Sequence, residues 1–153
     1  MKYEIVKHVD FCFGHRLIDY DGKCNQPLGH NGRVEIHLAA DELDALGMVA
    51  DFRDVRHAVE DWIDAHIDHR MVLRRDDPLI EAIEALGQHV FEVDENPTTE
   101  NMAKLLYGKV AELGFPVASL TLWETPDSYA TYTLERTPLA ADNGAAALRQ
   151  ASS

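Results

Sequence analysis

Two strands joined by a long turn can be read from residues 3–40, YEIVKHVDFCFGHRLIDYDGKCNQPLGHNGRVEIHLAA. In residues 3–14 the apolar side chains stand on one parity, as Ile5, Val9 and Phe11 do, and such alternation is typical of a strand with one buried face. Residues 30–40 alternate in the same way, and residues 19–29 between them are rich in turn-forming side chains. The stretch therefore predicts a strand, a turn-rich loop and a second strand.

The rest of the chain adds helices and two more strands. Apolar side chains recur at helical spacing over residues 51–66, and a short helix is expected over residues 78–86. Residues 96–100, Asn-Pro-Thr-Thr-Glu, combine a capping side chain, a proline and a carboxylate, which predict the start of a helix that ends at Gly114. Two short strands are expected over residues 117–125 and 129–136.

The main elements thus follow in the order strand, strand, helix, helix, strand, strand. This order predicts an α+β fold in which a helical pair covers one face of an antiparallel sheet. A four-stranded sheet has two open edges, and such edges favour assembly with further copies of the chain.

The length and charge of the chain indicate how many domains it has and which partners it can bind. At 153 residues it has the size of one domain, expected over residues 1–137 and followed by a flexible tail over residues 138–153. A formal net charge of −13 argues against nucleic acid and anionic membranes as partners, while Arg16, Lys23 and Arg33 leave room for a small phosphorylated substrate. The sequence has no signal peptide, no membrane-spanning segment and no disulfide framework, so a cytoplasmic location is expected.

Two histidines are the first candidates for a functional site. His15 continues the inward parity of the first strand and His30 has the inward parity of the second, so both are expected to point into one interior. Zinc favours imidazole nitrogens, and a catalytic zinc site has three protein ligands and one open position. The alternative is that each is a hydrogen-bonded histidine of the core, and spacing alone does not separate the two.

A cysteine and an Asp-His pair have the residue types of acid–base catalysis. Cys24 stands beside Lys23, and a neighbouring cation favours the thiolate that a base or nucleophile requires. Asp68 directly precedes His69, and a histidine oriented by a carboxylate is the usual form of a proton relay. The alternatives are an incidental loop cysteine and a solvated helix end.

Glu124 shares the inward parity of Leu120 and Leu122. A carboxylate turned toward the apolar side of a sheet needs a partner. A ligand with two parallel N–H donors, such as the edge of a pterin or guanine, would satisfy it, and so would a buried arginine.

In combination and order, these motifs resemble those of the 6-pyruvoyl-tetrahydropterin synthase family, which includes the bacterial 6-carboxy-tetrahydropterin synthases of the queuosine pathway. The resemblance extends from about residue 6 to residue 136. The matching motifs are Phe13-Gly14-His15-Arg16-Leu17, Lys23-Cys24, Gly29-His30-Asn31, Asp68-His69, Pro97-Thr98-Thr99-Glu100-Asn101 and Trp123-Glu124-Thr125. The resemblance implies a tunnelling fold (T-fold), with a four-stranded antiparallel sheet, two helices on one face, and assembly into a barrel-shaped homo-oligomer, commonly a hexamer of two trimers.

The resemblance also implies a zinc-dependent lyase whose substrate is the pterin 7,8-dihydroneopterin triphosphate. His15 and His30 would be zinc ligands, and Cys24 would be the general base. Asp68 and His69 would form the relay that completes the proton transfers.

The same resemblance implies how the pterin ring is held and which product forms. Glu124 would anchor the ring, with Thr98 and Thr99 close to it, contributed either by the same chain or across a subunit boundary. By analogy with bacterial relatives, 6-carboxy-tetrahydropterin is favoured over 6-pyruvoyl-tetrahydropterin as the product.

One position departs from the family pattern. The family motif after the cysteine ends in His-x-His, and the first of these positions is Leu28 here. His37 has the opposite parity on the same strand and cannot replace the missing imidazole. Three interpretations remain: zinc completed by another ligand, water or a substrate oxygen; Cys24 as the third ligand; or loss of the metal, which leaves a non-catalytic pterin-binding homologue.

Overall fold

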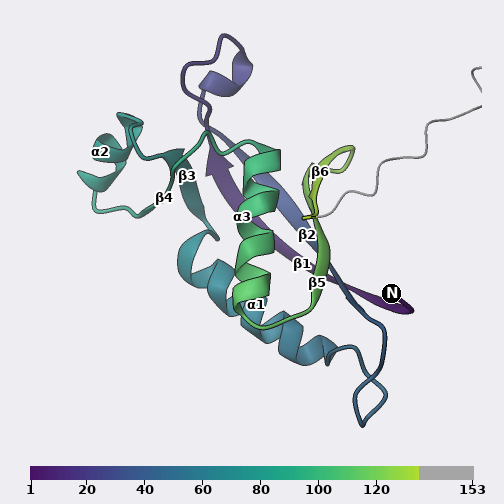
Figure 1. Cartoon of the computed structure of the whole chain (residues 1–153). Helices are drawn as coiled ribbons and strands as arrows, with labels where there is room; N and C mark the ends of the chain where they lie inside the picture. Colours follow the sequence, from purple (N-terminus) through teal and green to yellow (C-terminus); the bar gives the residue numbers. More distant parts are fainter. Residues whose placement is uncertain (135–153) are drawn as a thin grey trace, which may run out of the picture.

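The structure is a computed structural model and describes residues 1–134. Its central feature is a long antiparallel hairpin of β1 (Tyr3–His15) and β2 (Leu28–Ala40), in which His15 stands opposite Leu28. This confirms the predicted strand, loop and strand, except that the second strand begins at Leu28 and not at residue 30. Figure 1 shows the connecting loop, which contains the 3-10 turn η1 (Lys23–Asn25), projecting beyond the end of the sheet.

Further strands extend the hairpin on both sides. β5 (Val117–Thr125) pairs antiparallel with β2, and β6 (Ser128–Tyr132) pairs antiparallel with β5. On the other side, β3 (Arg70–Arg74) runs parallel to β1, and β4 (Val90–Val93) runs parallel to β3. The order across the sheet is β4-β3-β1-β2-β5-β6.

The expectation of a purely antiparallel, four-stranded sheet is therefore wrong. Within residues 1–134 the sheet is mixed and has six strands. The two additional strands hold only 5 and 4 residues, too few for an alternating pattern to stand out. Val72 and Leu73 are moreover buried in succession, as in parallel strands that are covered on both faces.

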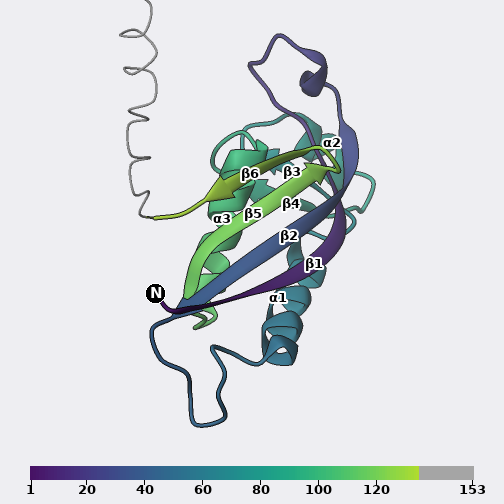
Figure 2. The same cartoon turned by 90° about the vertical axis from the view of Figure 1, so that its right-hand side faces the viewer.

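Two long helices, α1 (Phe52–His66) and α3 (Thr99–Glu112), lie on one face of the sheet, as Figures 1 and 2 show. Their apolar stripes, including Val59 and Leu106, pack on Ile36 and other inward residues of the strands to form the core. The resemblance implied two helices, and the structure has a third, α2 (Leu79–Glu84), within the segment where a short helix was expected.

Both long helices begin where a side chain caps them. Asp51 accepts a hydrogen bond from the N–H of Arg53 before α1, and Thr98 accepts one from the N–H of Asn101 before α3. After α3 the backbone of Gly114 is left-handed, with φ at 94°, which ends the helix as predicted.

The predicted strand over residues 129–136 is shorter in the structure, where β6 ends at Tyr132. The expected domain end at residue 137 and the expected flexible tail over residues 138–153 lie outside the described residues. None of the helices within residues 1–134 combines the length and the apolar character that crossing a bilayer requires.

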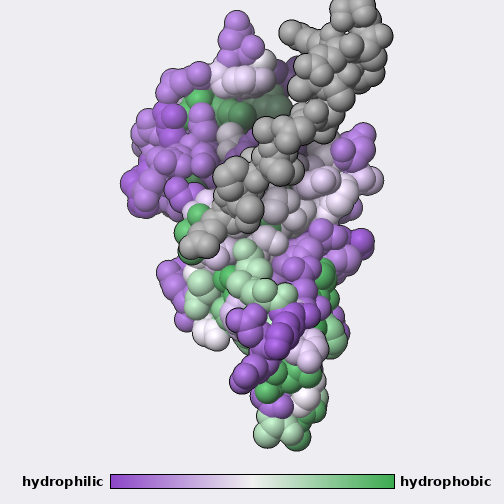
Figure 3. Space-filling model, turned by 45° about the vertical axis from the view of Figure 1, so that its right-hand side comes forward, coloured by the Kyte–Doolittle hydropathy of each residue, from purple (hydrophilic) through white to green (hydrophobic). Residues whose placement is uncertain are grey.

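Figure 3 shows hydrophobic side chains gathered at the lower end of the molecule, while much of the rest of this face is hydrophilic. The loop between β2 and α1 reaches this end and exposes Leu43, Leu46 and Met48. The candidate functional residues lie toward the opposite end of β1 and β2.

Candidate metal and catalytic site

The two predicted histidines meet at the end of the hairpin. His15 is the last residue of β1, and His30 lies on β2 opposite Phe13. Their Nε2 atoms are 3.1 Å apart, and the ring of Phe13 packs against both imidazoles. The structure thus confirms that the two strands aim both histidines into one interior.

Leu28 lies directly opposite His15 in the strand register and is half-buried. A histidine at this position would belong to the same face as His30, because alternate residues of a strand share a face. His37, on the other face of β2, pairs with Glu4 and lies away from the histidine pair. The position that would hold the family's further imidazole is therefore apolar.

A backbone carbonyl orients the imidazole of His15. The His15 side chain is only 4% exposed, and its Nδ1 donates a hydrogen bond to the carbonyl oxygen of Pro97 at 2.7 Å. A histidine that uses Nδ1–H in this way turns the lone pair of Nε2 toward the interior. This is the arrangement typical of a metal-ligating histidine.

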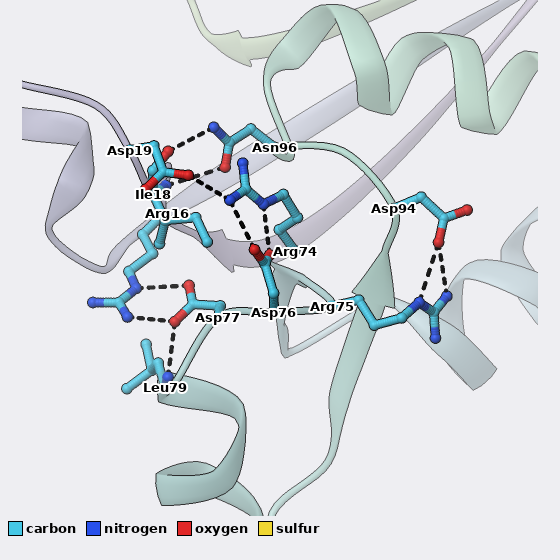
Figure 4. A network of polar contacts seen from close by, with 10 residues as sticks. All are labelled: Arg16, Ile18, Asp19, Arg74, Arg75, Asp76, Asp77, Leu79, Asp94 and Asn96. Atoms are coloured by element: carbon cyan, nitrogen blue, oxygen red, sulfur yellow. Dashed lines mark hydrogen bonds and ion pairs between the residues drawn. The ribbon is translucent and has the colours of Figure 1, made fainter.

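The segment that carries Pro97 is tied to the exit of β1. The side-chain amide of Asn96 donates to the carbonyl of Ile18 and accepts from its N–H, at 2.8 and 3.1 Å. In Figure 4 these bonds lie beside the ion pairs of Arg16 with Asp77 and of Arg74 with Asp76 and Asp19. The network holds the start of α3 against β1 and so sets the position of the Pro97 carbonyl.

Glu124 turns its carboxylate toward the histidine pair. It follows the inward residues Leu120 and Leu122 on β5, as predicted, and its Oε1 lies 3.0 Å from His15 Nε2 and 3.3 Å from His30 Nε2. Burial lowers the pKa of His30; the Glu124 carboxylate opposes this effect and the proximity of His15 adds to it. The partner of the inward carboxylate is therefore a pair of imidazoles, and not an arginine.

These three residues form a donor set that suits a divalent metal. One ligand atom from each of His15, His30 and Glu124 lies within 4.8 Å of the other two. Two imidazoles and a carboxylate are a ligand set that catalytic zinc sites use. Cys24 is not part of this group in the described part of the chain, so the geometry does not favour it as the third ligand.

The predicted Asp-His pair is formed, but on the other face of the sheet. His69 Nδ1 donates to Asp68 Oδ2 at 2.8 Å, in the turn between α1 and β3. His69 Nε2 lies 3.3 Å from the sulfur of Cys12, and the N–H of His69 bonds to the Cys12 carbonyl. Cys12 has the parity opposite to His15 on β1, so the strand itself separates this pair from the metal-suited group.

The surroundings of Asp68 keep it ionised. Burial opposes its charge, but the N–H of Cys12 and the imidazole of His69 hold the pKa of the Asp68 carboxyl below its ordinary value. The backbone of His69 is left-handed, with φ at 59°, a conformation that costs a non-glycine residue about 1–3 kcal/mol and is concentrated at functional sites.

A cavity of ≈ 770 Å³ opens on this second face and is lined by Cys12, Asp68 and His69, with Arg33 and Trp123 beside them. Sequence reasoning treated Cys12 only as a strand residue. Its parity indicates the face on which it lies, but nothing local links it to a histidine 57 positions away.

The remaining predicted residues surround these two groups. Cys24 is half-buried in η1, and its carbonyl accepts from the N–H of Leu17, which closes the loop after β1. Thr98 and Thr99 follow Pro97 at the start of α3, and Thr98 is the helix cap. The structure therefore places both threonines one and two residues from the carbonyl that orients His15.

Two of the three basic residues proposed to attract a phosphorylated substrate are already neutralised. Arg16 forms a two-pronged pair with Asp77, and Arg33 forms one with Asp10. Arg33 holds the pKa of the Asp10 carboxyl below its ordinary value. Lys23, in η1, is exposed.

Comparison with known proteins agrees with the family resemblance and with the fold. The model of the family described as 6-pyruvoyl tetrahydropterin synthase matches residues 4–135. The chain is 36% identical over 130 residues to a 6-carboxy-5,6,7,8-tetrahydropterin synthase of Rickettsia conorii and 38% identical over 130 residues to that of Rickettsia typhi. Each comparison covers 80% of this chain and 94% of the relative.

Solved structures show the same fold. An uncharacterized protein from Wolinella succinogenes superposes with a TM-score of 0.71 at 29% identity, covering 87% of this chain and 98% of that protein. The 6-pyruvoyl tetrahydropterin synthase of Caenorhabditis elegans superposes with a TM-score of 0.64 at 24% identity, covering 87% and 96%. With a family model that spans nearly all of the described residues, this chain belongs to the 6-pyruvoyl tetrahydropterin synthase family.

Proposed function

We propose that this chain is a zinc-dependent lyase that converts 7,8-dihydroneopterin triphosphate to 6-carboxy-tetrahydropterin. One observation carries the proposal: the Nε2 atoms of His15 and His30 lie 3.1 Å apart, while His15 Nδ1 donates a hydrogen bond to the Pro97 carbonyl. The 6-carboxy product is favoured over 6-pyruvoyl-tetrahydropterin because the bacterial relatives at 36% and 38% identity are 6-carboxy-tetrahydropterin synthases.

His15 and His30 would hold the zinc ion, which as a Lewis acid makes a C–H bond next to a bound substrate oxygen more acidic. Cys24, as the general base, accepts that proton. Asp68 orients His69, whose imidazole handles the second proton when the leaving group departs. Glu124, Thr98 and Thr99 would hold the pterin ring, as the family resemblance implies.

The relay would act on the metal site of a neighbouring copy. Within one chain, β1 separates His69 from His15, since Cys12 and His15 have opposite parity. Among residues 1–134, β4 and β6 are the edge strands of the sheet, and sheet edges favour pairing with further copies. We therefore propose a homo-oligomer, a hexamer of two trimers as the family resemblance implies, in which one subunit supplies the metal site and another supplies Asp68 and His69.

The test is turnover of 7,8-dihydroneopterin triphosphate by purified, zinc-loaded protein, with the products identified by mass spectrometry. A 6-carboxy product supports the proposal, and its loss in His15→Ala ties it to this site. A 6-pyruvoyl product keeps the lyase but changes the branch of the family.

A non-catalytic pterin-binding protein is the second candidate, and Leu28 is the observation that favours it, because an apolar side chain suits a site that has lost its metal. Bound pterin without any product, in protein shown to contain zinc, would establish this second function.

A further inference from the structure

Glu124 lies where the two histidines lack a third partner, and we propose that it is the third protein ligand of the metal, in place of the imidazole that the family carries at position 28. This inference rests on the proposed function only for the identity of the ion. It assigns Glu124 to the metal, where the resemblance alone assigned it to the pterin ring.

The distances between the three donor atoms match a metal-binding set. Zinc–nitrogen and zinc–oxygen bonds of about 2.0–2.1 Å in a tetrahedral site place neighbouring ligand atoms about 3.3–3.4 Å apart. The separations here are 3.1 Å between the two Nε2 atoms, and 3.0 and 3.3 Å from these atoms to Glu124 Oε1. One ion can therefore contact all three atoms with little movement of the side chains.

The hydrogen atoms of the site lead to the same conclusion. His15 uses its Nδ1 hydrogen in the bond to Pro97, so neutral His15 presents only a lone pair at Nε2. That lone pair faces the carboxylate oxygen of Glu124, which is also an acceptor. A metal ion between two acceptors 3.0 Å apart replaces their mutual repulsion with an attraction to both.

The position of Leu28 explains why the third ligand comes from β5. Leu28 lies on β2 next to His15, and β5 pairs with the other side of β2. A carboxylate that reaches the histidines from β5 fills the coordination position that an apolar residue on β2 leaves open. Glu124 then offers one oxygen to the metal, and its second oxygen remains able to accept a single N–H from a pterin ring.

The experiment measures zinc affinity without substrate, by competition with a chromophoric chelator. We expect Glu124→Gln to weaken zinc binding at least about 100-fold, because substitution of residues that only hydrogen-bond to a zinc ligand already costs roughly 10–100-fold. The double substitution Leu28→His with Glu124→Gln supplies an imidazole beside His15 and should recover most of the lost affinity. This recovery also shows that Glu124→Gln did not simply misfold the site.

Glu35→Gln is the matched control. Glu35 also contacts a histidine, with Oε1 3.1 Å from His8 Nε2, and its side chain is 23% exposed against 25% for Glu124, but it lies on the other face of β2. Its substitution should leave the zinc affinity unchanged. Cobalt-loaded protein adds a second readout, because a Cys24 thiolate ligand would produce a sulfur-to-cobalt charge-transfer band that two imidazoles and a carboxylate do not.

Unchanged zinc affinity in Glu124→Gln would overturn the proposal, and so would a wild-type protein that binds no zinc or a cobalt spectrum with a thiolate band. The proposed function is tested separately. If zinc binding depends on Glu124 but no product forms, this inference stands and the lyase assignment is wrong. If the protein is active but its zinc affinity does not depend on Glu124, the lyase assignment stands and this inference is wrong.

Discussion

The two cysteines of the chain lie in different chemical surroundings, although both are free thiols. Cys24 is in the loop after β1, where it fits the family motif of the general base. Cys12 is on β1, with its sulfur 3.3 Å from His69 Nε2, and its N–H donates to Asp68. The family motif indicates that Cys24 is the base. Within one chain, however, Cys12 is the cysteine that contacts Asp68 and His69.

Substitution of each thiol separates these roles. We expect Cys24→Ala to lower kcat at least about 100-fold, the usual contribution of a general base, with zinc affinity unchanged because Glu124 and the histidines hold the ion. Cys12→Ala should lower kcat much less, since Cys12 only contacts the relay. Steady-state kinetics with 7,8-dihydroneopterin triphosphate make the measurement, and the reverse ranking of the two variants would assign the base to Cys12.

At the scale of elements, the segment before α3 has two structural tasks. Asn96 ties it to Ile18 at the exit of β1, and Thr98 caps the helix. Between them, Pro97 offers its carbonyl to His15. A helix start that sequence reasoning identified as a cap therefore also orients a candidate metal ligand.

Removal of the cap should destabilise α3 without touching the histidines. Thr98→Ala is expected to lower the free energy of unfolding by about 1 kcal/mol, the usual value of an N-cap hydrogen bond. Thr98→Ser keeps the hydroxyl that accepts from Asn101 and should unfold close to the wild type. Urea denaturation followed by circular dichroism compares the two, and equal losses would show that the methyl group, and not the hydroxyl, stabilises this position.

The Arg16–Asp77 pair couples the exit of β1 to the turn before α2. The Asp77 side chain is fully buried; burial opposes its ionisation, but the Arg16 guanidinium and the N–H of Leu79 hold the pKa of the Asp77 carboxyl below its ordinary value. A carboxyl with a lowered pKa in the folded state adds stability above its unfolded pKa, and this stability is lost as the pH falls through the folded value.

The free energy of unfolding should therefore decrease as the pH is lowered below about 4, the pKa of an unfolded aspartate. Asp77→Asn should be less stable than the wild type at pH 7 by about 2 kcal/mol, the usual worth of hydrogen bonds to a charged group. The difference should shrink toward pH 3. Denaturation at a series of pH values makes the comparison, and a difference that is independent of pH would mean that Asp77 gains nothing from its charge.

At the scale of the whole molecule, both faces of the sheet carry candidate functional residues. The face covered by α1 and α3 carries His15, His30 and Glu124 at its end, while the opposite face carries the cavity with Cys12, Asp68 and His69. Within one chain only His30 of the metal-suited group lines a cavity together with His69, whereas His15 and Glu124 lie on the opposite side of β1 from the relay. We therefore expect the metal-suited group of one copy to work with the relay of another.

Mixing two inactive variants tests this arrangement. His15→Ala lacks a metal ligand and His69→Ala lacks the relay, and each alone should be inactive. After joint unfolding and reassembly, some sites would combine an intact metal group from one copy with an intact relay from another, so activity should return to a sizeable fraction of the wild-type value. Light scattering gives the number of copies, and mixed oligomers without any activity would show that each chain works by itself.

The sequence by itself determined the hairpin, the inward direction of His15, His30 and Glu124, the start of α3 and the family. These features depend on alternation and capping, which act between residues close together in the chain. The strands β3 and β4 were not predicted, because with 5 and 4 residues they are too short to show an alternating pattern.

Only the tertiary structure decided which groups meet. The contact of Glu124 with the histidines requires β5 to pair with β2, and that of Cys12 with His69 requires the end of α1 to return to β1. A strand pattern indicates which way a side chain points, but its partner comes from a distant segment, and the pairing of strands is settled by the packing of the whole core. For this reason the inward direction of His15, His30 and Glu124 could be predicted from the sequence, whereas the contact of Glu124 with the two histidines could not.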